Sequence, residues 1–332
     1  MPYRKRRDRM LKKHSTLSIY RHLCNLAKQN GLILPEKKGR PCVVEKYKQV
    51  CFILLWKIYH EGLEKMELDS ELYLLRHYDH SNFAYHYHRL DSVVIERFTS
   101  TYESLIMHFL EREILLHVLD STAISTSVRE ERTREGLRIK EKLTQKFHTL
   151  LGYDPPLQIV VVEGAKSTTH HVSDSKGGIL LLKKGLKGYC LGDGAYETYE
   201  LTQATEDLGI IPIYKPQAKR AVKKTLSAKK RRRDSWNGNP QRLYKEIRGI
   251  GEVLYGAATR AGLLHSQSRL IPQQHKDALI IGLRQNLLTY LRLDALKRII
   301  RKTPLTHKPY KALNSPPTHD AYNNRALYKR EG

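Results

Sequence analysis

The pattern of apolar residues changes once along this chain, near Glu113, and that change limits the folds that the chain can adopt. Apolar residues before it recur at helical spacing, at Leu17, Tyr20, Leu23 and Leu26 and within the ranges 44–63 and about 93–110. No alternating, strand-like pattern interrupts them. About the first hundred residues therefore predict an all-α module.

After Glu113 the apolar residues form short runs of the β type. These runs are ILLHVLDSTAIS (114–125), FHTLLGY (147–153), LQIVVVEGA (157–165), GYCLGD (188–193) and IIPIY (210–214). The first strand is expected to end at Asp120, and the charged stretch of about 25 residues that follows is expected to form a loop or a helix. Residues 154–156 (Asp-Pro-Pro) predict a hairpin turn between the second and third runs.

Two helices are expected between the later strands. Asp174 and Ser175 are predicted to cap a helix that continues through Leu186, and a second helix is predicted to end at Gly209. The resulting order, β-β-β-α-β-α-β-α, predicts a mixed sheet with helices on its faces.

The charge of the chain indicates a polyanionic partner. Its formal net charge is +25 over 332 residues, and 40% of these are hydrophobic, so the chain can bury a core and global disorder is excluded. Nucleic acid is the first candidate, and a basic protein at a membrane surface is the alternative. Because no apolar run is long enough to span a membrane, and none follows the basic N-terminus as in a signal peptide, no membrane association and a cytoplasmic location are expected.

A possible helix-turn-helix lies within the all-α part. A short helix from Glu71 is followed by a polar break, and Ser81 is a plausible N-cap for a second short helix that reaches about Leu90. The second helix carries His86, His88 and Arg89, which suits a helix that enters a major groove. An ordinary helical hairpin is the alternative.

Cysteine and histidine were considered as metal ligands. The four cysteines, Cys24, Cys42, Cys51 and Cys190, contain no C-x-x-C pair, so they are interpreted as packing residues. The histidines clustered between His77 and Arg89 could suggest a metal site by spacing alone. No cysteine or carboxylate arrangement nearby completes a tetrahedral set, so the sequence favours a non-metal role for them.

Two segments are too polar to pack. Residues 215–240 carry many cations and few large apolar side chains, and they predict a mobile loop that contacts DNA phosphates without reading the base sequence. Its basic residues are Lys215, Lys219, Arg220, Lys223, Lys224, Lys229, Lys230, Arg231, Arg232 and Arg233. Residues 306–332 predict an extended C-terminal tail, most simply a solvated one.

Two strands each deliver a carboxylate to their ends. Asp120 follows HVL, where an ionised carboxylate is costly to bury unless a cation or a full set of donors meets it. Asp193 follows CLG, and Gly192 and Gly194 beside it allow the close approach of a ligand or a backbone. Two strand-terminal aspartates in one sheet can meet at a metal ion.

A third carboxylate is expected from a helix after Asn239. Tyr244, Arg248 and Glu252 are four residues apart and therefore share one helical face, on which Glu252 is expected to point inwards. Glu246 is the competitor. It lies about two-thirds of a turn from that face and is interpreted as a solvated charge.

These segments resemble the DDE transposases of prokaryotic insertion sequences, within the superfamily numbered four and five. HVLDSTAI resembles the strand with the first Asp, LGDGAYETYEL the strand with the second Asp, and YKEIRGIGEVLYG the Tyr-Arg-Glu helix, and the resemblance spans roughly residues 40 to 300. The separations, 193 − 120 = 73 and 252 − 193 = 59, suit a catalytic domain without a large inserted β-domain. Two departures are a Tyr four rather than three residues before the Arg, and Thr259 followed by Arg260 where the family has a Lys.

The resemblance implies an RNase H-like α/β catalytic domain preceded by an all-α DNA-binding module. The expected division is 1–105 for DNA binding, 106–305 for catalysis and 306–332 for the tail. Asp120, Asp193 and Glu252 would hold two Mg2+ ions, for which Mn2+ would substitute, with Asp120 bridging both ions. The expected auxiliary residues are Tyr244, Arg248, Arg260 and Asp174, the last as a helix cap first and a polar residue of the site second.

The partners implied by the resemblance are double-stranded DNA, as transposon ends and as target, and a second copy of the chain on that DNA. The expected location is then the nucleoid within the cytoplasm. Two alternatives stay open: a non-catalytic DNA-binding protein, either a decayed transposase or a repressor, and an RNase H-like repair nuclease. The second alternative shares the metal site but needs no module for recognising transposon ends.

Overall fold

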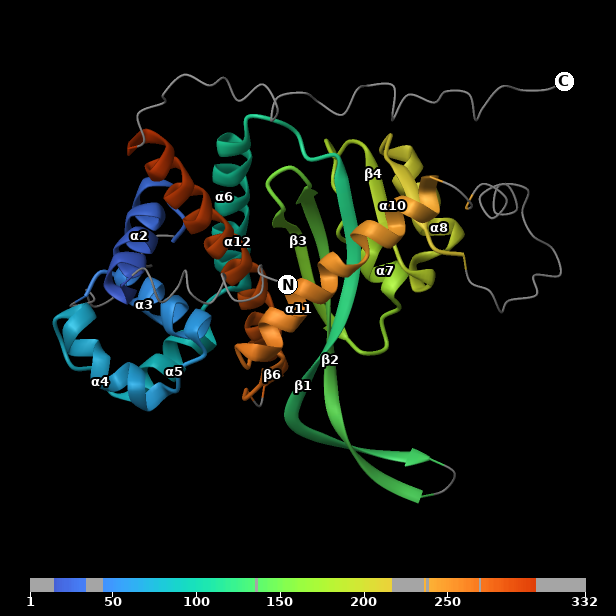
Figure 1. Ribbon diagram of the computed structural model, residues 1–332. Helices are drawn as coiled ribbons and strands as arrows, with labels where there is room; N and C mark the ends of the chain where they lie inside the picture. The colour runs from blue at the N-terminus through green and yellow to red at the C-terminus, as the bar shows by residue number, and fades with distance from the viewer. Residues whose placement is uncertain are drawn as a thin grey trace, which may run out of the picture.

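The computed structural model describes residues 15–33, 44–134, 137–216, 236, 239–268 and 270–302. Its N-terminal part is helical, as expected, and lies beside a mixed sheet (Figure 1). The helices of this part are α2 (Thr16–Gln29), α3 (Lys46–Tyr59), α4 (Leu63–Leu74), α5 (His80–Arg89) and α6 (Ser92–Leu110).

The sheet has the order β3-β2-β1-β4-β5, and the short strand β6 pairs with β1. Its strands are β1 (Leu116–Arg134), β2 (Leu137–Asp154), β3 (Ile159–Thr169), β4 (Tyr189–Gly192), β5 (Ile211–Tyr214) and β6 (His265–Ser266). β1 and β2 are antiparallel, as are β2 and β3, whereas β4 is parallel to both β1 and β5. This is the mixed α/β sheet flanked by helices that the element order predicted.

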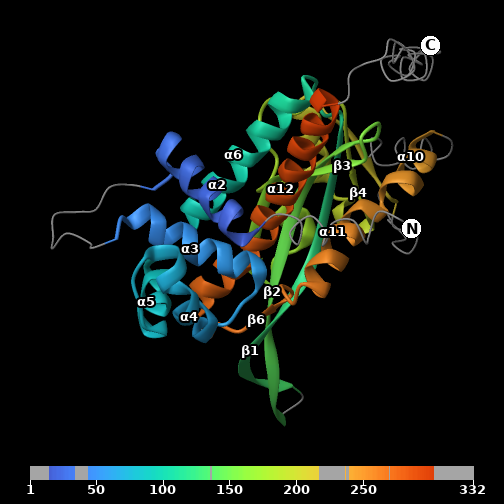
Figure 2. The same cartoon turned by 60° about the vertical axis from the view of Figure 1, so that its left-hand side comes forward.

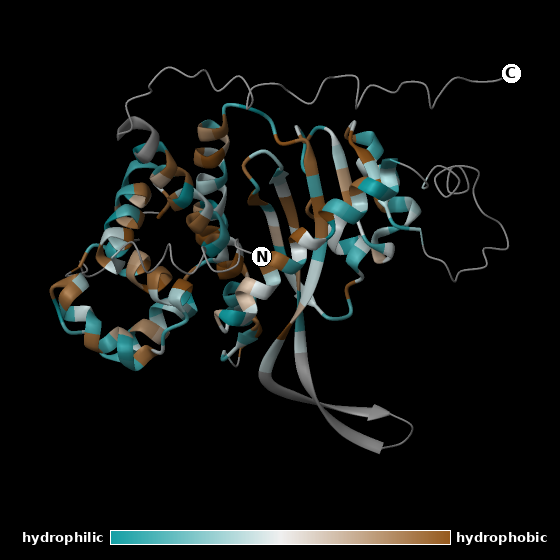
Figure 3. Cartoon of the chain, in the orientation of Figure 1, coloured by the Kyte–Doolittle hydropathy of each residue, from teal (hydrophilic) through white to brown (hydrophobic). Residues whose placement is uncertain are grey.

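Helices cover both faces of this sheet (Figures 1 and 2). The later helices are α7 (Asp174–Ile179), the 3-10 turn η1 (Gly194–Tyr196), α8 (Tyr199–Asp207), α10 (Asn239–Ile247), α11 (Gly249–Arg260) and α12 (Ile271–Lys302). α6, α11 and α12 contact one face, and α7 and α8 lie at the other. Figure 3 shows α10 as largely hydrophilic and the strands with stretches of hydrophobic residues between the helices.

Strand alternation separates two cores and fixes the direction of each side chain on β1. Leu119 packs with Leu150 and Tyr196 on the α7 face, whereas Val118 packs with Leu151 in the larger core on the α11 and α12 face. The cross-strand pairs Val118 with Leu151 and Leu119 with Leu150 fit this alternation. Asp120, two residues after Val118, is therefore on the α11 face.

The charged segment after Asp120 is paired backbone, so the expected loop or helix is wrong. β1 continues through Asp120 to Arg134 and pairs with β2 as far as Leu137, as a long hairpin that extends below the sheet in Figure 1. The sequence pattern missed it because backbone hydrogen bonds between two strands need no alternation of apolar residues. Asp120 consequently lies inside a strand, while Asp193 follows directly after β4.

Several helix boundaries also differ from expectation. α4 begins at Leu63 rather than near Glu71. Asp79, not Ser81, caps α5, because its side chain accepts a hydrogen bond from the Ser81 backbone N–H. Ser173, not Asp174, caps α7, which ends at Ile179.

The single helix expected after Asn239 is two helices, α10 and α11, that meet at Arg248. Arg248 itself keeps α-type backbone angles, with φ −52° and ψ −31°, and its N–H still bonds to the Tyr244 carbonyl. The helical path therefore continues from Tyr244 towards Glu252 in spite of the interruption.

α12 fixes the edge of the sheet. The Asn286 side chain accepts from the Val162 N–H at 2.7 Å and donates to the Val162 carbonyl at 2.9 Å, and Gln285 donates to the Val160 carbonyl. These amides satisfy backbone groups of the edge strand β3, which would otherwise be open for pairing. Among the described residues, no helix combines the length and the apolar character that are needed to span a membrane.

α12 also joins the N-terminal helices to the sheet through Asp277. One carboxylate oxygen accepts from the Tyr87 hydroxyl of α5 at 2.6 Å, and the other accepts from the hydroxyls of Ser266 and Ser268 at 2.7 Å each. Ser266 belongs to β6, which pairs with β1.

The predicted domain boundary at 105/106 falls inside α6, and the tail 306–332 lies outside the described residues.

Candidate active site

Asp120 is the fifth residue of β1, and its carboxylate points towards α11. Its Oδ1 accepts a hydrogen bond from the Ser121 backbone N–H at 2.8 Å. Beneath it, the Thr149 hydroxyl bonds to the Tyr255 hydroxyl at 2.7 Å, and both groups are buried. Thr149 is also the cross-strand partner of Asp120. The buried, hydrogen-bonded pair of Thr149 and Tyr255 therefore packs beside Asp120.

Gly251 brings the α11 backbone against this carboxylate. A Cβ built on Gly251 would lie 1.6 Å from Asp120 Oδ2 and 2.6 Å from its Cγ, a distance that no side chain could tolerate. The approach therefore requires glycine at this position. It also places Glu252, the next residue on α11, in the immediate neighbourhood of Asp120.

The electrostatic environment of Asp120 disfavours its ionised form. Burial is the main cause, and the negative charges of Asp193, Asp174 and Glu252 add to it, so that the pKa of the Asp120 carboxyl rises to about 7. The Ser121 N–H opposes the rise. Because the charges of the other carboxylates act on Asp120, the site has an excess of negative charge around this strand.

Asp193 follows directly after β4, as the sequence predicted. Its side chain caps η1, with Oδ1 accepting from the Ala195 N–H at 2.8 Å. The residue is exposed, which leaves its second carboxylate oxygen free to meet a ligand. A Cβ at Gly192 would lie 2.9 Å from the Tyr196 Cβ, so the glycine before Asp193 lets the chain turn tightly into η1.

The expected Tyr-Arg-Glu face is only partly buried. Tyr244 is buried, while Arg248 and Glu252 are exposed, so the expectation that Glu252 points inwards is wrong in terms of burial. Burial raises the pKa of the Tyr244 hydroxyl, and so do the charges of Asp193, Asp120 and Glu252, whereas Arg248 lowers it. The charges of all three predicted carboxylates therefore act on one tyrosine.

Glu246 has a partner of its own. Its Oε1 lies 3.0 Å from Nε of Arg242, four residues earlier on α10, and both side chains are exposed. The competitor of Glu252 is thus a solvated helix charge, in line with the sequence interpretation.

The three carboxylates form a spread set. In the part of the chain that the structure describes, the group Glu67, Asp79 and His80 is the one whose metal-ligand atoms all lie within 4.8 Å of one another, so the predicted triad is wider than this. Among the same residues, none of Asp120, Asp193 and Glu252 forms an ion pair with a lysine or an arginine.

Asp174 lies at the other face of β1, in a polar cluster with Ser121, Lys146 and His148. Its Oδ1 is 2.8 Å from Lys146 Nζ and 3.8 Å from His148 Nδ1, and it accepts a hydrogen bond from the Ser121 hydroxyl. Asp174 therefore contacts Ser121, the residue after Asp120, and it is not the helix cap expected first.

The predicted DNA-reading residues are on α5, which is fixed at both ends. Phe83 and Tyr87 are buried, and Lys276 of α12 donates to the backbone carbonyls of Tyr87, His88 and Leu90 at 2.5 to 3.0 Å. His88 and Arg89 are exposed, whereas His86 is half-buried. The Arg89 guanidinium hydrogen-bonds to the Tyr85 hydroxyl, so this tyrosine belongs to the same surface.

Of the basic residues predicted to contact DNA phosphates, the structure describes Lys215. Lys215 follows β5, and its N–H bonds to the Gly192 carbonyl at 3.0 Å, directly before Asp193. The remaining basic residues of the predicted loop, Lys219 to Arg233, lie outside the described residues. Arg260 is exposed at the end of α11.

Sequence reasoning missed Gly251, Lys146 and Ser121. A signal for Gly251 was present, because GIGEV places two glycines in a helix, where each lowers helix stability by about 1 kcal/mol relative to alanine. Only one of the two approaches another residue, since a Cβ at Gly249 would meet nothing within 4 Å. Lys146 lies 28 residues before Asp174, and the packing of α7 against β2 brings the two side chains together.

Comparisons with known proteins give no family for this chain. No family model and no curated protein matches it. Solved structures that resemble it include a Mos1 transposase paired-end complex with left transposon end, with 9% identity, 69% of this chain and 82% of that chain covered, and a TM-score of 0.20. The Mos1 strand transfer complex has 11% identity, 71% and 84% coverage and a TM-score of 0.21. A likeness at such TM-scores implies no common activity.

Proposed function

We propose that this chain is a DNA transposase, which cleaves transposon ends and joins them to target DNA with divalent metal ions held by Asp120, Asp193 and Glu252. The observation that carries the proposal is the gathering of these carboxylates from β1, the end of β4 and α11, without an ion pair among the described residues. A half-buried carboxylate is costly to ionise unless a cation meets it, and Asp120 has no ion pair among the described residues, which favours a metal-binding role for Asp120 together with the exposed Asp193 and Glu252.

The donor set fits Mg2+ and also Mn2+. All three side chains offer hard carboxylate oxygens, the ligands that these ions prefer. The spread of the set would suit two ions better than one, with Asp120, Asp193 and Glu252 as the residues that would hold them. When bound, the two ions would activate the attacking water or 3′-hydroxyl and stabilise the leaving oxygen.

The protein's own residues would orient this site. The Ser121 N–H and the α11 backbone at Gly251 hold the Asp120 carboxylate from two sides. Asp193 is fixed by the Ala195 N–H, so its rotation is limited before any ligand arrives. Arg248, which is exposed one turn before Glu252, would contact a DNA phosphate.

DNA would be bound by two further regions. The exposed end of α5 with His88 and Arg89 would read the transposon end, and Lys215 with the basic residues up to Arg233 would contact phosphates. We further propose that two copies act together on double-stranded DNA, because two ends must be brought to one target.

The test is a strand-transfer assay with DNA taken from the sequence flanking the reading frame. Labelled end DNA should become covalently joined to a supercoiled plasmid in the presence of Mg2+, and EDTA should prevent it. Cleavage without joining would contradict the transposase and favour the repair nuclease. Binding without either reaction would favour a non-catalytic DNA-binding protein.

A further inference from the structure

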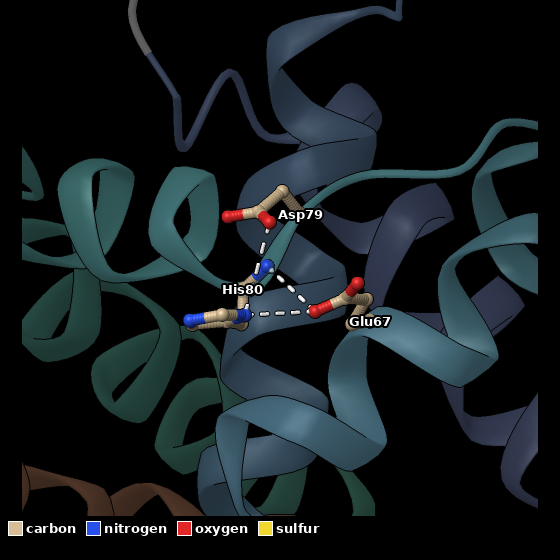
Figure 4. A group of neighbouring side chains, drawn as sticks. All are labelled: Glu67, Asp79 and His80. Atoms are coloured by element: carbon tan, nitrogen blue, oxygen red, sulfur yellow. Dashed lines mark hydrogen bonds and ion pairs between the residues drawn. The ribbon is translucent and has the colours of Figure 1, made fainter.

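A second group of metal-ligand side chains lies far from β1, where α4 meets α5. Glu67 of α4, the cap residue Asp79 and His80 of α5 have ligand atoms that all lie within 4.8 Å of one another. Figure 4 shows the three side chains converging across the connection between the two helices. His80 Nδ1 is 2.8 Å from Glu67 Oε2 and 3.8 Å from Asp79 Oδ2.

A second histidine stands beside this group. His77 Nε2 is 3.4 Å from Glu67 Oε1, and its Nδ1 is 3.7 Å from Glu71 Oε1. The sequence favoured a non-metal role for these histidines because no cysteine or carboxylate arrangement nearby completed a tetrahedral set. The fold supplies carboxylates beside them, because the packing of α4 against α5 places Glu67 next to His77 and His80. Glu67 precedes His77 by ten residues in the chain.

The separations suit a tetrahedral ion. Two ligand atoms, each about 2.1 Å from a tetrahedral Zn2+, are about 3.4 Å apart. The distances from His80 Nδ1 to Glu67 and Asp79, 2.8 and 3.8 Å, lie on either side of that value. Imidazole nitrogen also favours Zn2+ over Mg2+, which prefers oxygen ligands.

Backbone groups already orient the carboxylates. Asp79 Oδ1 accepts from the Ser81 N–H at 2.7 Å, which leaves Oδ2 directed to His80. Glu67 Oε2 accepts from the His80 N–H at 3.1 Å. Hydrogen bonds of this kind hold metal ligands in position and limit the rearrangement that an ion would require.

We propose that Glu67, Asp79 and His80 bind one Zn2+ ion, and that His77, which lies outside this group but 3.4 Å from Glu67, turns in as a fourth ligand. About half of each of the Asp79, His80 and His77 side chains is exposed, so an ion can enter from solvent. The ion joins α4 to the first turn of α5, whose other end Lys276 fixes. It thereby holds the angle at which α5 presents His88 and Arg89.

This site is separate from the carboxylates around Asp120 and does not depend on the proposed reaction. It requires a borderline ion and imidazole, whereas the Asp120 site offers oxygen ligands alone. Excess Mg2+ can therefore occupy the Asp120 site while Zn2+ is titrated into the full-length protein by calorimetry.

The wild-type protein should take up one equivalent of Zn2+ in excess Mg2+ and unfold at a higher temperature with it. His80→Gln should weaken this binding at least about tenfold. Asp79→Asn should do the same, although asparagine caps a helix as well as aspartate does. The matched control is His88→Gln, which removes an exposed histidine of the same helix outside the group and should leave Zn2+ affinity unchanged.

Circular dichroism of each variant tests whether it folds. If His80→Gln does not fold, Asp79→Asn still tests the proposal. The inference is overturned if the wild type takes up no Zn2+ under these conditions. It is equally overturned if uptake is the same in Asp79→Asn as in the wild type, or if His88→Gln abolishes it. A failure of strand transfer has no bearing on these outcomes.

Discussion

Gly251 and Asp120 are in such close contact that a methyl group on the glycine would lie 1.6 Å from the carboxylate oxygen Oδ2. The contact joins the helix that carries Glu252 to the central strand that carries Asp120. The relative position of the two carboxylates therefore depends on it.

Gly251→Ala should therefore reduce metal-dependent DNA cleavage by about a hundredfold or more, because a displacement of about 1 Å at a catalytic group has an effect of that size. Gly249→Ala is the matched control. A Cβ there meets nothing within 4 Å, so activity should persist and the helix should gain up to about 1 kcal/mol. Cleavage rates and melting temperatures of both variants are the measurements. Equal activity of the two would contradict the role given to the contact.

Asp120→Asn should stabilise the metal-free protein in a pH-dependent way. The pKa of Asp120 is about 7 in the folded chain and about 3.9 when unfolded. A raised carboxyl pKa means that the folded protein loses stability as pH rises from about 4 to about 7, and the loss is complete above that. The difference of about three pKa units corresponds to at most about 4 kcal/mol, and solvent screening reduces it to about 1 to 2 kcal/mol.

Thermal unfolding of both proteins in EDTA, at several pH values, measures this difference. The melting temperature of Asp120→Asn should exceed that of the wild type near about pH 8 and match it near about pH 4. A gain that does not change with pH would mean that the charge of Asp120 is not the cause.

Substituting His88 and Arg89 by alanine should lower the preference for transposon-end DNA over random DNA more than the total affinity. The exposed end of α5 is the proposed reading surface, and base contacts specify whereas phosphate contacts only position. Competition gel shifts give both quantities. Arg298→Ala, near the end of α12, is the control and should preserve the preference. An equal loss on both DNAs would count against a reading helix.

Replacing Lys229, Lys230, Arg231 and Arg232 by alanine should flatten the salt dependence of DNA binding. Each phosphate contact contributes about 0.9 to the slope of log affinity against log salt, so the slope should fall by roughly three to four units. Specificity should hardly change. An unchanged slope would show that these four residues do not contact DNA.

The sequence predicted the parts of the fold that depend on local patterns. Asp193 directly follows a short apolar strand and has a glycine on each side. Both the strand and its end were predictable from this pattern. The continuation of β1 beyond Asp120 was not, because the pairing of charged residues 129–134 with residues 137–142 depends on the partner strand. The cap of α5 was misplaced by two residues because aspartate and serine are equally good caps, and only the geometry selects Asp79.

The candidate site shows the same limit. Glu252 was chosen over Glu246 by helical spacing, and the exposed pairing of Glu246 with Arg242 agrees with that choice. The carboxylates of Asp174 and Glu67 could not be placed by spacing, since the packing of α7 against β1 and β2 and of α4 against α5 brings their partners from elsewhere in the chain.

The central claim is that Asp120, Asp193 and Glu252 act through bound metal ions, and cleavage of end DNA by charge-neutralised variants tests it most directly. Asp120→Asn, Asp193→Asn and Glu252→Gln should each lose Mg2+-dependent cleavage while gel shifts show end DNA bound as by the wild type, because the amides keep the shape and lose the charge that holds the cation. Glu246→Gln should cleave normally. Cleavage that persists in Asp120→Asn, or that is lost in Glu246→Gln but kept in Glu252→Gln, would contradict the account.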